Sequence, residues 1–131
     1  MVNTSRMRGR DGGFTLIELL VVLAIVALLL TIAVPRYFSS LRHSREAALK
    51  ENLKVLRVTL DKYAGDKGHF PETLEELVTQ KYLRAVPVDP ITESAQTWVP
   101  VTDNNGDNHG IVDVHSGAQG ASQEGTAYAA F

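Results

Sequence analysis

One carboxylate in this sequence lies inside an apolar stretch that carries no other charge. Glu18 falls within residues 14–34, whose remaining polar side chains are Thr15 and Thr31. A threonine hydroxyl can donate to a carbonyl one helical turn earlier, so neither threonine is costly in an apolar setting. A carboxylate at membrane depth is costly and marks a functional position. We therefore expect Glu18 to pair with a positive group supplied within the membrane.

The segment before this stretch contains a candidate source of that positive charge. Residues 1–13 carry three arginines against one aspartate and end in two glycines. A short basic leader ahead of an apolar segment is how an export signal begins. Cleavage after the accessible Gly13 would leave a new amine on Phe14, four residues and one helical turn from Glu18. That amine could neutralise Glu18 of the same subunit or of a neighbouring one.

Residues 14–34 are long enough to cross a membrane as one helix. Their 21 residues would extend for about 31 Å, and the apolar core of a bilayer is about 30 Å thick. The arginines of the leader favour a cytoplasmic N-terminus. Pro35 removes one helical hydrogen bond and clashes with the preceding turn. We expect a bend at Pro35 and not the end of the helix, since the helical periodicity resumes directly after it.

A second apolar pattern follows and predicts an amphipathic helix. Its apolar residues recur at spacings of four and three, which places them along one helix face. They are Leu49, Leu53, Leu56, Leu60 and Tyr63, and Leu41 and Ala48 are expected to extend the same face. Glu46 and Lys50 are expected to pair on the exposed side, and Gly65 and Gly68 to end the helix. A two-stranded coiled coil is the alternative for this face, but the pattern is short and a C-terminal domain follows that can pack on it.

The C-terminal part of the chain predicts a small mixed domain. Residues 71–78 begin with a proline and an acidic turn and make a short amphipathic helix. Residues 97–101 and 110–115 are rich in β-branched side chains and flank a turn-rich segment, which predicts two antiparallel strands. Residues 116–127 are rich in small residues and are expected to form an irregular loop, closed by the two aromatic residues after it. The fold class is therefore α+β.

Charge is distributed unevenly after the apolar stretch. Residues 36–62, which we call the stalk, carry seven Lys or Arg against three acids, a net charge of +4. Residues 63–131, which we call the head, carry three against ten, a net charge of −7. Because opposite charges attract, staggered subunits would place the head of one beside the stalk of another. The alternative is that both are ordinary solvated surfaces.

The sequence contains no motif that predicts an enzyme. It has no nucleophile with an adjacent base, no G-x-S-x-G and no phosphate-binding glycine loop. Asp103, Asn105 and Asp107 alternate as at the start of an EF-hand loop, but Asn108 and Val114 stand where that loop needs glycine and glutamate. A solvated turn is the better interpretation of this segment.

Residues 13–18, which read Gly-Phe-Thr-Leu-Ile-Glu, and the apolar helix after them resemble the class III signal of type IV pilins and type II secretion pseudopilins. The resemblance implies that a prepilin peptidase cuts between Gly13 and Phe14 and methylates the Phe14 amine. It also implies that Glu18 pairs with the Phe14 amine of an adjacent subunit when a helical filament assembles. An uncleaved signal anchor with a stray glutamate is the alternative.

Looser motifs in the head resemble the major, G-type pseudopilin of type II secretion. They include Tyr63, Gly68-His69-Phe70-Pro71, Tyr82-Leu83, Pro87, Asp89, Pro90, Gly110, Asp113 and Ser116-Gly117. The resemblance implies three parts: a cleaved leader (1–13), a transmembrane and assembly helix (14–35), and a stalk helix with a periplasmic head (36–131).

The same resemblance implies a place and a role for the protein. It would be a single-pass protein of the inner membrane that joins a periplasmic filament and drives export of folded proteins through the outer-membrane secretin. Its partners would be copies of itself, prepilin peptidase, minor pseudopilins, the inner-membrane assembly platform and the membrane. A type IV pilus major or minor pilin is one alternative, and a membrane-tethered periplasmic binding module is another. The negative head argues against binding nucleic acid.

Members of this family often bind calcium through acidic residues in the final loop. Such a site takes six to eight oxygen ligands, several of them charged. Here residues 116–131 contain a single carboxylate, that of Glu124. The candidate calcium ligands are therefore few: Asp113, Ser116 and Glu124.

Overall fold

The computed structural model describes residues 2, 12–106 and 109–131. The three arginines of the leader and the pair Asp107-Asn108 lie outside the described residues, as does most of the leader predicted over residues 1–13. The chain divides into two compact units, Met1–Phe38 and Ser39–Phe131, which are described separately below. The domain boundary predicted after residue 35 stays a prediction.

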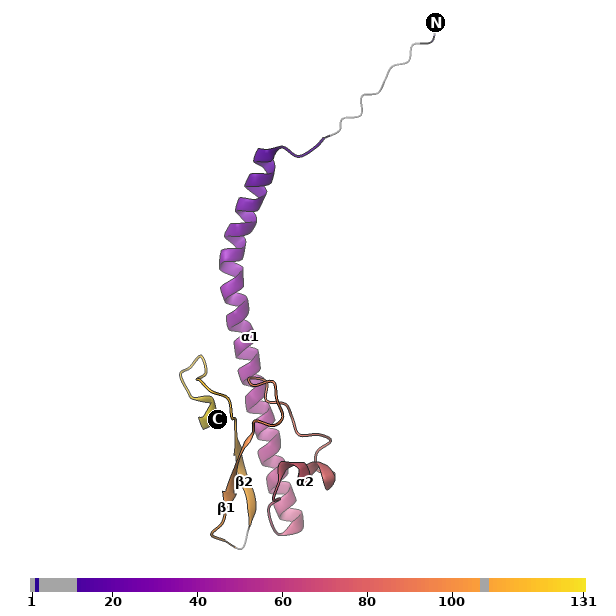
Figure 1. Ribbon diagram of the computed structural model, residues 1–131, viewed down its shortest axis with the longest axis vertical. Helices are drawn as coiled ribbons and strands as arrows, with labels where there is room; N and C mark the ends of the chain where they lie inside the picture. Colours follow the sequence, from indigo (N-terminus) through magenta and orange to yellow (C-terminus); the bar gives the residue numbers. More distant parts are fainter. Residues whose placement is uncertain (1, 3–11, 107–108) are drawn as a thin grey trace. The chain divides into compact units, whose positions relative to one another are not determined.

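Five elements follow one another along the described chain (Figure 1). They are helix α1 (Leu16–Lys67), helix α2 (Leu74–Thr79), strands β1 (Val99–Asp103) and β2 (Gly110–His115), and the short 3-10 helix η1 (Tyr128–Ala130). The α+β class predicted from the sequence is confirmed.

The first unit contains the apolar part of α1. The helix continues through Pro35 without interruption, as predicted, and the bend at that residue stays a prediction. The Thr31 hydroxyl donates to the Ala27 carbonyl at 2.8 Å, also as predicted. The most apolar 18-residue window of α1 has a mean hydropathy of 3.0, and none of it is buried by the rest of the chain. Such a surface requires lipid or other protein chains around it.

In the second unit, the C-terminal part of α1 supplies one wall of the hydrophobic core. The predicted apolar face is buried from Leu49 to Tyr63, but its predicted extension to Leu41 and Ala48 is wrong, because both are exposed. It packs with residues of α2, of β2, of the segment before β1 and of the C-terminal loop, among them Leu74, Leu77, Trp98, Ile111, Val114, Ala118 and Tyr128. Because the head of the same chain covers this face, it is not available for the alternative two-stranded coiled coil. The helix ends at Lys67, and Gly68 follows in the left-handed region with φ of 78°.

The predicted surface pair of Glu46 and Lys50 is wrong. Glu46 is only 6% exposed and accepts hydrogen bonds from the C-terminal loop. The Lys50 ammonium instead lies 5.2 Å from the ring centroid of Phe131. Glu46 stands three residues before Leu49, on the buried face of the helix, and the i, i+4 spacing alone did not show which face the pair occupies.

Helix α2 begins three residues later than the sequence pattern suggested. Thr73 is its N-cap, and the threonine hydroxyl accepts from the Glu76 backbone N–H at 3.3 Å. A cap of this kind satisfies an N–H that has no partner within the helix, so it fixes where the helix starts.

The two strands pair antiparallel, with Val99 opposite His115 and Asp103 opposite Gly110. A bulge interrupts the register between Val101 and Thr102. The first strand starts two residues later than predicted because Trp98 leaves the ladder. Its indole N–H donates to the Pro87 carbonyl at 2.7 Å, and its ring is buried in the core.

Candidate assembly site

The predicted assembly residues lie at the start of α1. Phe14 precedes the helix and is 89% exposed. Together with Ile17, Glu18, Val21 and Val22 it lines an open groove of about 340 Å³. The Glu18 side chain is exposed, and in the part of the chain that the structure describes it forms no ion pair. Among its described residues, the unit therefore presents one carboxylate, on an apolar surface.

Thr15 has a role that sequence reasoning missed. Its hydroxyl accepts from the Glu18 backbone N–H at 3.2 Å, so Thr15 caps α1. The expectation that this hydroxyl donates to an earlier carbonyl was wrong, because no helical turn precedes it. The spacing Thr-x-x-Glu is the sequence signal of a capping box, and it recurs at Thr73 and Glu76. The cap places Glu18 in the first turn, where the helix dipole favours a negative charge.

Gly13 is not required by the fold of this chain. A methyl group built at Gly13 would meet no atom of the described residues within 4 Å. At Gly117, by contrast, the same addition would collide with the Thr97 carbonyl oxygen. Neither packing nor a left-handed backbone therefore accounts for glycine at position 13.

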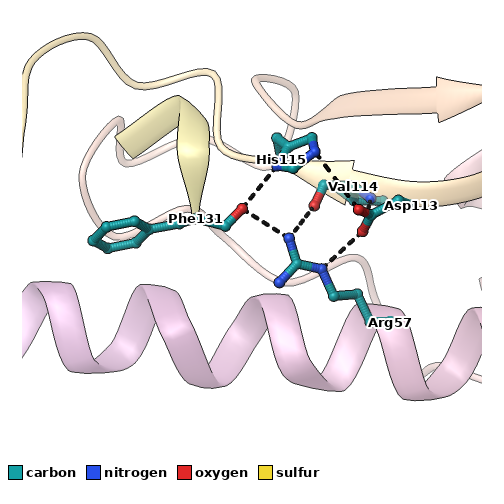
Figure 2. A network of polar contacts seen from close by, with 5 residues as sticks. All are labelled: Arg57, Asp113, Val114, His115 and Phe131. Atoms are coloured by element: carbon teal, nitrogen blue, oxygen red, sulfur yellow. Dashed lines mark hydrogen bonds and ion pairs between the residues drawn. The ribbon is translucent and has the colours of Figure 1, made fainter. Parts of the chain in front are cut away.

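Asp113, the first calcium candidate, belongs to a polar network that joins α1 to the end of β2 (Figure 2). Arg57 donates to the Asp113 carboxylate at 2.8 Å, to the Val114 carbonyl at 3.0 Å and to a main-chain oxygen of Phe131 at 2.7 Å. His115 Nδ1 lies 2.8 Å from the same Phe131 oxygen. Burial by itself raises the pKa of Asp113, but the hydrogen bonds from Arg57 and from the Val114 N–H outweigh it and hold that pKa below its ordinary value.

The other two calcium candidates have different surroundings. The Ser116 hydroxyl donates to the Asp89 carboxylate at 2.5 Å, and both residues are buried. Glu124 is exposed and lines a cavity of about 260 Å³ with Lys50 and Arg57. Among residues 12–106 and 109–131, no group of three or more His, Asp or Glu side chains is placed to hold a metal ion.

Two further acids organise the head, the fully buried Asp89 and the partly buried Glu76, and sequence reasoning assigned neither of them a tertiary contact. Asp89 is fully buried and accepts from the Ile91 N–H at 2.8 Å and from the Ser116 hydroxyl, so it joins the loop before β1 to the loop after β2. Its signal was the turn-forming Asp-Pro dipeptide. Glu76 accepts from the Tyr63 hydroxyl at 2.6 Å. This hydrogen bond, with burial, raises the pKa of Tyr63 to about 12.

Residues 8–34 match the family model described as the prokaryotic N-terminal methylation motif. The chain is 32% identical over 111 residues to the type II secretion system core protein G of Pseudomonas aeruginosa, a match that covers 72% of this chain and 78% of that protein. It is 28% identical over 123 residues to the core protein G of Klebsiella pneumoniae, covering 82% and 84%.

A pilin is also similar to the chain. The type IV major pilin protein PilA of Myxococcus xanthus is 33% identical over 76 residues, which cover 58% of this chain and 34% of the pilin. The chain thus spans about a third of that pilin's length. No solved structure gives a significant match.

Proposed function

The chain belongs to the family of the type II secretion system core protein G, and we infer from this that it is a pseudopilin subunit. The observation that carries this inference is the length of the match, which extends over 78% of a core protein G but only 34% of a pilin. A type IV pilus subunit is therefore not the better supported function. The chain is a membrane-anchored protein whose head faces the periplasm, and its named relatives are structural proteins.

Processing of the leader is the first step that we propose. Prepilin peptidase would cut between Gly13 and Phe14 and methylate the new amine. Support comes from the methylation motif over residues 8–34, from the exposure of Phe14, and from the absence of any packing reason for Gly13. A peptidase that accepts only glycine before the cleaved bond would explain the glycine at position 13.

Assembly follows from the charge that processing creates. The Phe14 amine of one subunit would pair with Glu18 of the next, so that each joining subunit neutralises a carboxylate in an apolar setting. Two unpaired charges at membrane depth are each costly, whereas a contact between them recovers much of that cost. The pairing would set the register between neighbouring helices.

The apolar part of α1 would lie first in lipid and then among copies of itself. As a monomer the subunit would wait in the inner membrane as a single-pass protein, with lipid around the unburied side chains. In the filament, copies of the same helix would replace the lipid. The filament would then push folded proteins towards the outer-membrane secretin, with minor pseudopilins and the inner-membrane assembly platform as partners and no enzymatic step by this chain.

The mass of the membrane-extracted protein tests this proposal, in cells with and without prepilin peptidase. We expect a chain that starts at methylated Phe14 and is lost when the peptidase is absent. An intact Met1 in both strains would mean a simple signal anchor, and the filament mechanism would be withdrawn.

Glu18→Ala tests the pairing step, with Thr31→Val as a control that also removes a polar group from the apolar stretch. We expect processed E18A protein that fails to form cysteine crosslinks between neighbouring α1 helices, while T31V crosslinks normally. Normal crosslinking of E18A would refute the pairing, and equal loss in both variants would mean that any change of the helix surface prevents assembly. A membrane-tethered binding module would give no crosslinks in any variant.

A further inference from the structure

The final loop, residues 116–131, is where the family resemblance suggested calcium, but its residues do not fit that ion. Asp113 is engaged by the Arg57 guanidinium at 2.8 Å, and Ser116 by Asp89. The remaining candidate, Glu124, shares its cavity with Lys50 and Arg57. Two cations beside one carboxylate repel a divalent cation. Calcium needs six to eight oxygens, several of them charged, and these side chains do not provide them.

The loop closes on itself through its own backbone. The Ser122 N–H donates to the Thr126 carbonyl at 2.8 Å, and the Tyr128 N–H donates to the Gly120 carbonyl at 3.1 Å. Ala121 and Ala127 pair as an isolated antiparallel bridge between these bonds. The tip turns at Gly125, whose φ of 87° suits glycine. Residues 120–128 thus form a miniature hairpin, but a hairpin of this size is not stable alone in water.

A carboxylate of α1 fastens this hairpin to the helix. Glu46 Oε1 accepts from the Gln123 backbone N–H at 3.1 Å and from the Tyr128 hydroxyl at 2.9 Å. The Gln123 side chain also donates to the Ser39 carbonyl at 2.8 Å. One contact to Glu46 comes from the turn of the hairpin and the other from the end of its second arm, so one buried carboxylate holds the hairpin at two points. Hydrogen bonds to a charged acceptor are stronger than those between neutral groups.

We propose that Glu46 does in this protein what a metal ion would do in an acidic loop: it fixes the C-terminal loop, which therefore folds without calcium. In a calcium loop the ion is the positive centre and the loop supplies the carboxylates. Here the polarity is reversed, because the loop supplies the donors and the helix supplies one carboxylate. The composition of the loop, with one exposed acid, agrees with this arrangement.

Hydrogen exchange of the loop amides tests the proposal on the full chain in detergent micelles. The wild type is compared in calcium chloride and in EGTA, alongside Glu46→Ala and the control Glu51→Ala, which removes an exposed carboxylate from the same helix. We expect equal exchange of the wild type in both solutions. E46A should exchange residues 118–131 about tenfold faster or more, as loss of a charged hydrogen-bond acceptor predicts, while E51A behaves as wild type.

Either of two results would overturn the proposal: faster exchange of the wild-type loop in EGTA than in calcium, or a loop in E46A as protected as in E51A. If E46A unfolds the whole head, which the fluorescence of Trp98 reports, Tyr128→Phe decides instead, because it removes only the hydroxyl contact. Faster loop exchange in a folded Y128F protein supports the anchor, and unchanged exchange refutes it.

Discussion

Replacing Arg57 by alanine should destabilise the head substantially. In Figure 2, Arg57 is the residue of α1 whose side chain contacts both β2 and the end of the C-terminal loop. It donates three hydrogen bonds, of 2.7 to 3.0 Å. A hydrogen bond to a charged group contributes about 1.5 to 3 kcal/mol. The Arg57 and Asp113 side chains are 37% and 38% exposed, so water replaces part of what is lost. We therefore expect R57A to lower the free energy of unfolding by about 2 kcal/mol.

Arg45→Ala is the matched control on the same helix. The Arg45 guanidinium lies 3.5 Å from Glu93, and the two side chains are 46% and 73% exposed. An exposed pair of this kind contributes about 0.5 kcal/mol or less. Urea unfolding of the full chain in micelles, followed by the fluorescence of the single tryptophan, Trp98, measures both variants. Equal stabilities of R57A and R45A would refute the assignment of the Arg57 network as a structural joint.

The pH dependence of R57A tests the contribution of the ion pair with Asp113. The pKa of Asp113 is lower in the folded chain than in the unfolded one. The stability contributed by this carboxylate is therefore fully present above its unfolded pKa of about 3.9, and is lost as the pH falls through the lower folded value. The difference between wild type and R57A should shrink in acid. An undiminished difference there would show that Asp113 is not the partner that matters.

Two more predictions follow from the head. The pKa of Tyr63 is raised to about 12 mainly by its hydrogen bond to Glu76, so Glu76→Gln should lower the Tyr63 pKa. Titration of labelled tyrosines by NMR measures this pKa. An unchanged value would refute the hydrogen bond as the cause. Gly117→Ala should destabilise the head by about 1 to 3 kcal/mol through overpacking against the Thr97 carbonyl, whereas Gly65→Ala, in open space within α1, should stabilise it by about 0.5 to 1 kcal/mol. Thermal unfolding compares the two alanines, and equal melting temperatures would contradict the close approach at Gly117.

Sequence periodicity predicted the helices and the buried face of α1 because those features depend on neighbours close in the chain. Spacing alone predicts one common helix face for Leu49, Leu53, Leu56 and Leu60. The boundaries of α2 and β1 were shifted by a cap at Thr73 and by burial of Trp98, two contacts whose local signals are weak. Strand and helix ends are set by such single hydrogen bonds and are correspondingly harder to predict.

The polar contacts of the head could not be predicted, since they join residues far apart in the chain. Glu46 meets Tyr128 across 82 positions, and Arg57 meets Asp113 across 56. Composition allowed Glu46 to be a surface residue, and only the tertiary fold shows that the loop covers it. The candidates Gly13, Phe14 and Glu18 present the opposite case, because their motif is contiguous and needs no tertiary information.

The two kinds of residue also differ in what their substitution can reveal. Arg57, Glu46 and Gly117 meet atoms of their own chain, so changes there act on the stability of the head. Phe14 is exposed, and a methyl group at Gly13 would touch none of the described residues, so the described part of the fold gives no reason for either residue type. Variants at these two positions should therefore leave the unfolding of the head unchanged. Any defect they cause has to arise in a step that involves a second molecule, which is the property expected of a processing and assembly site.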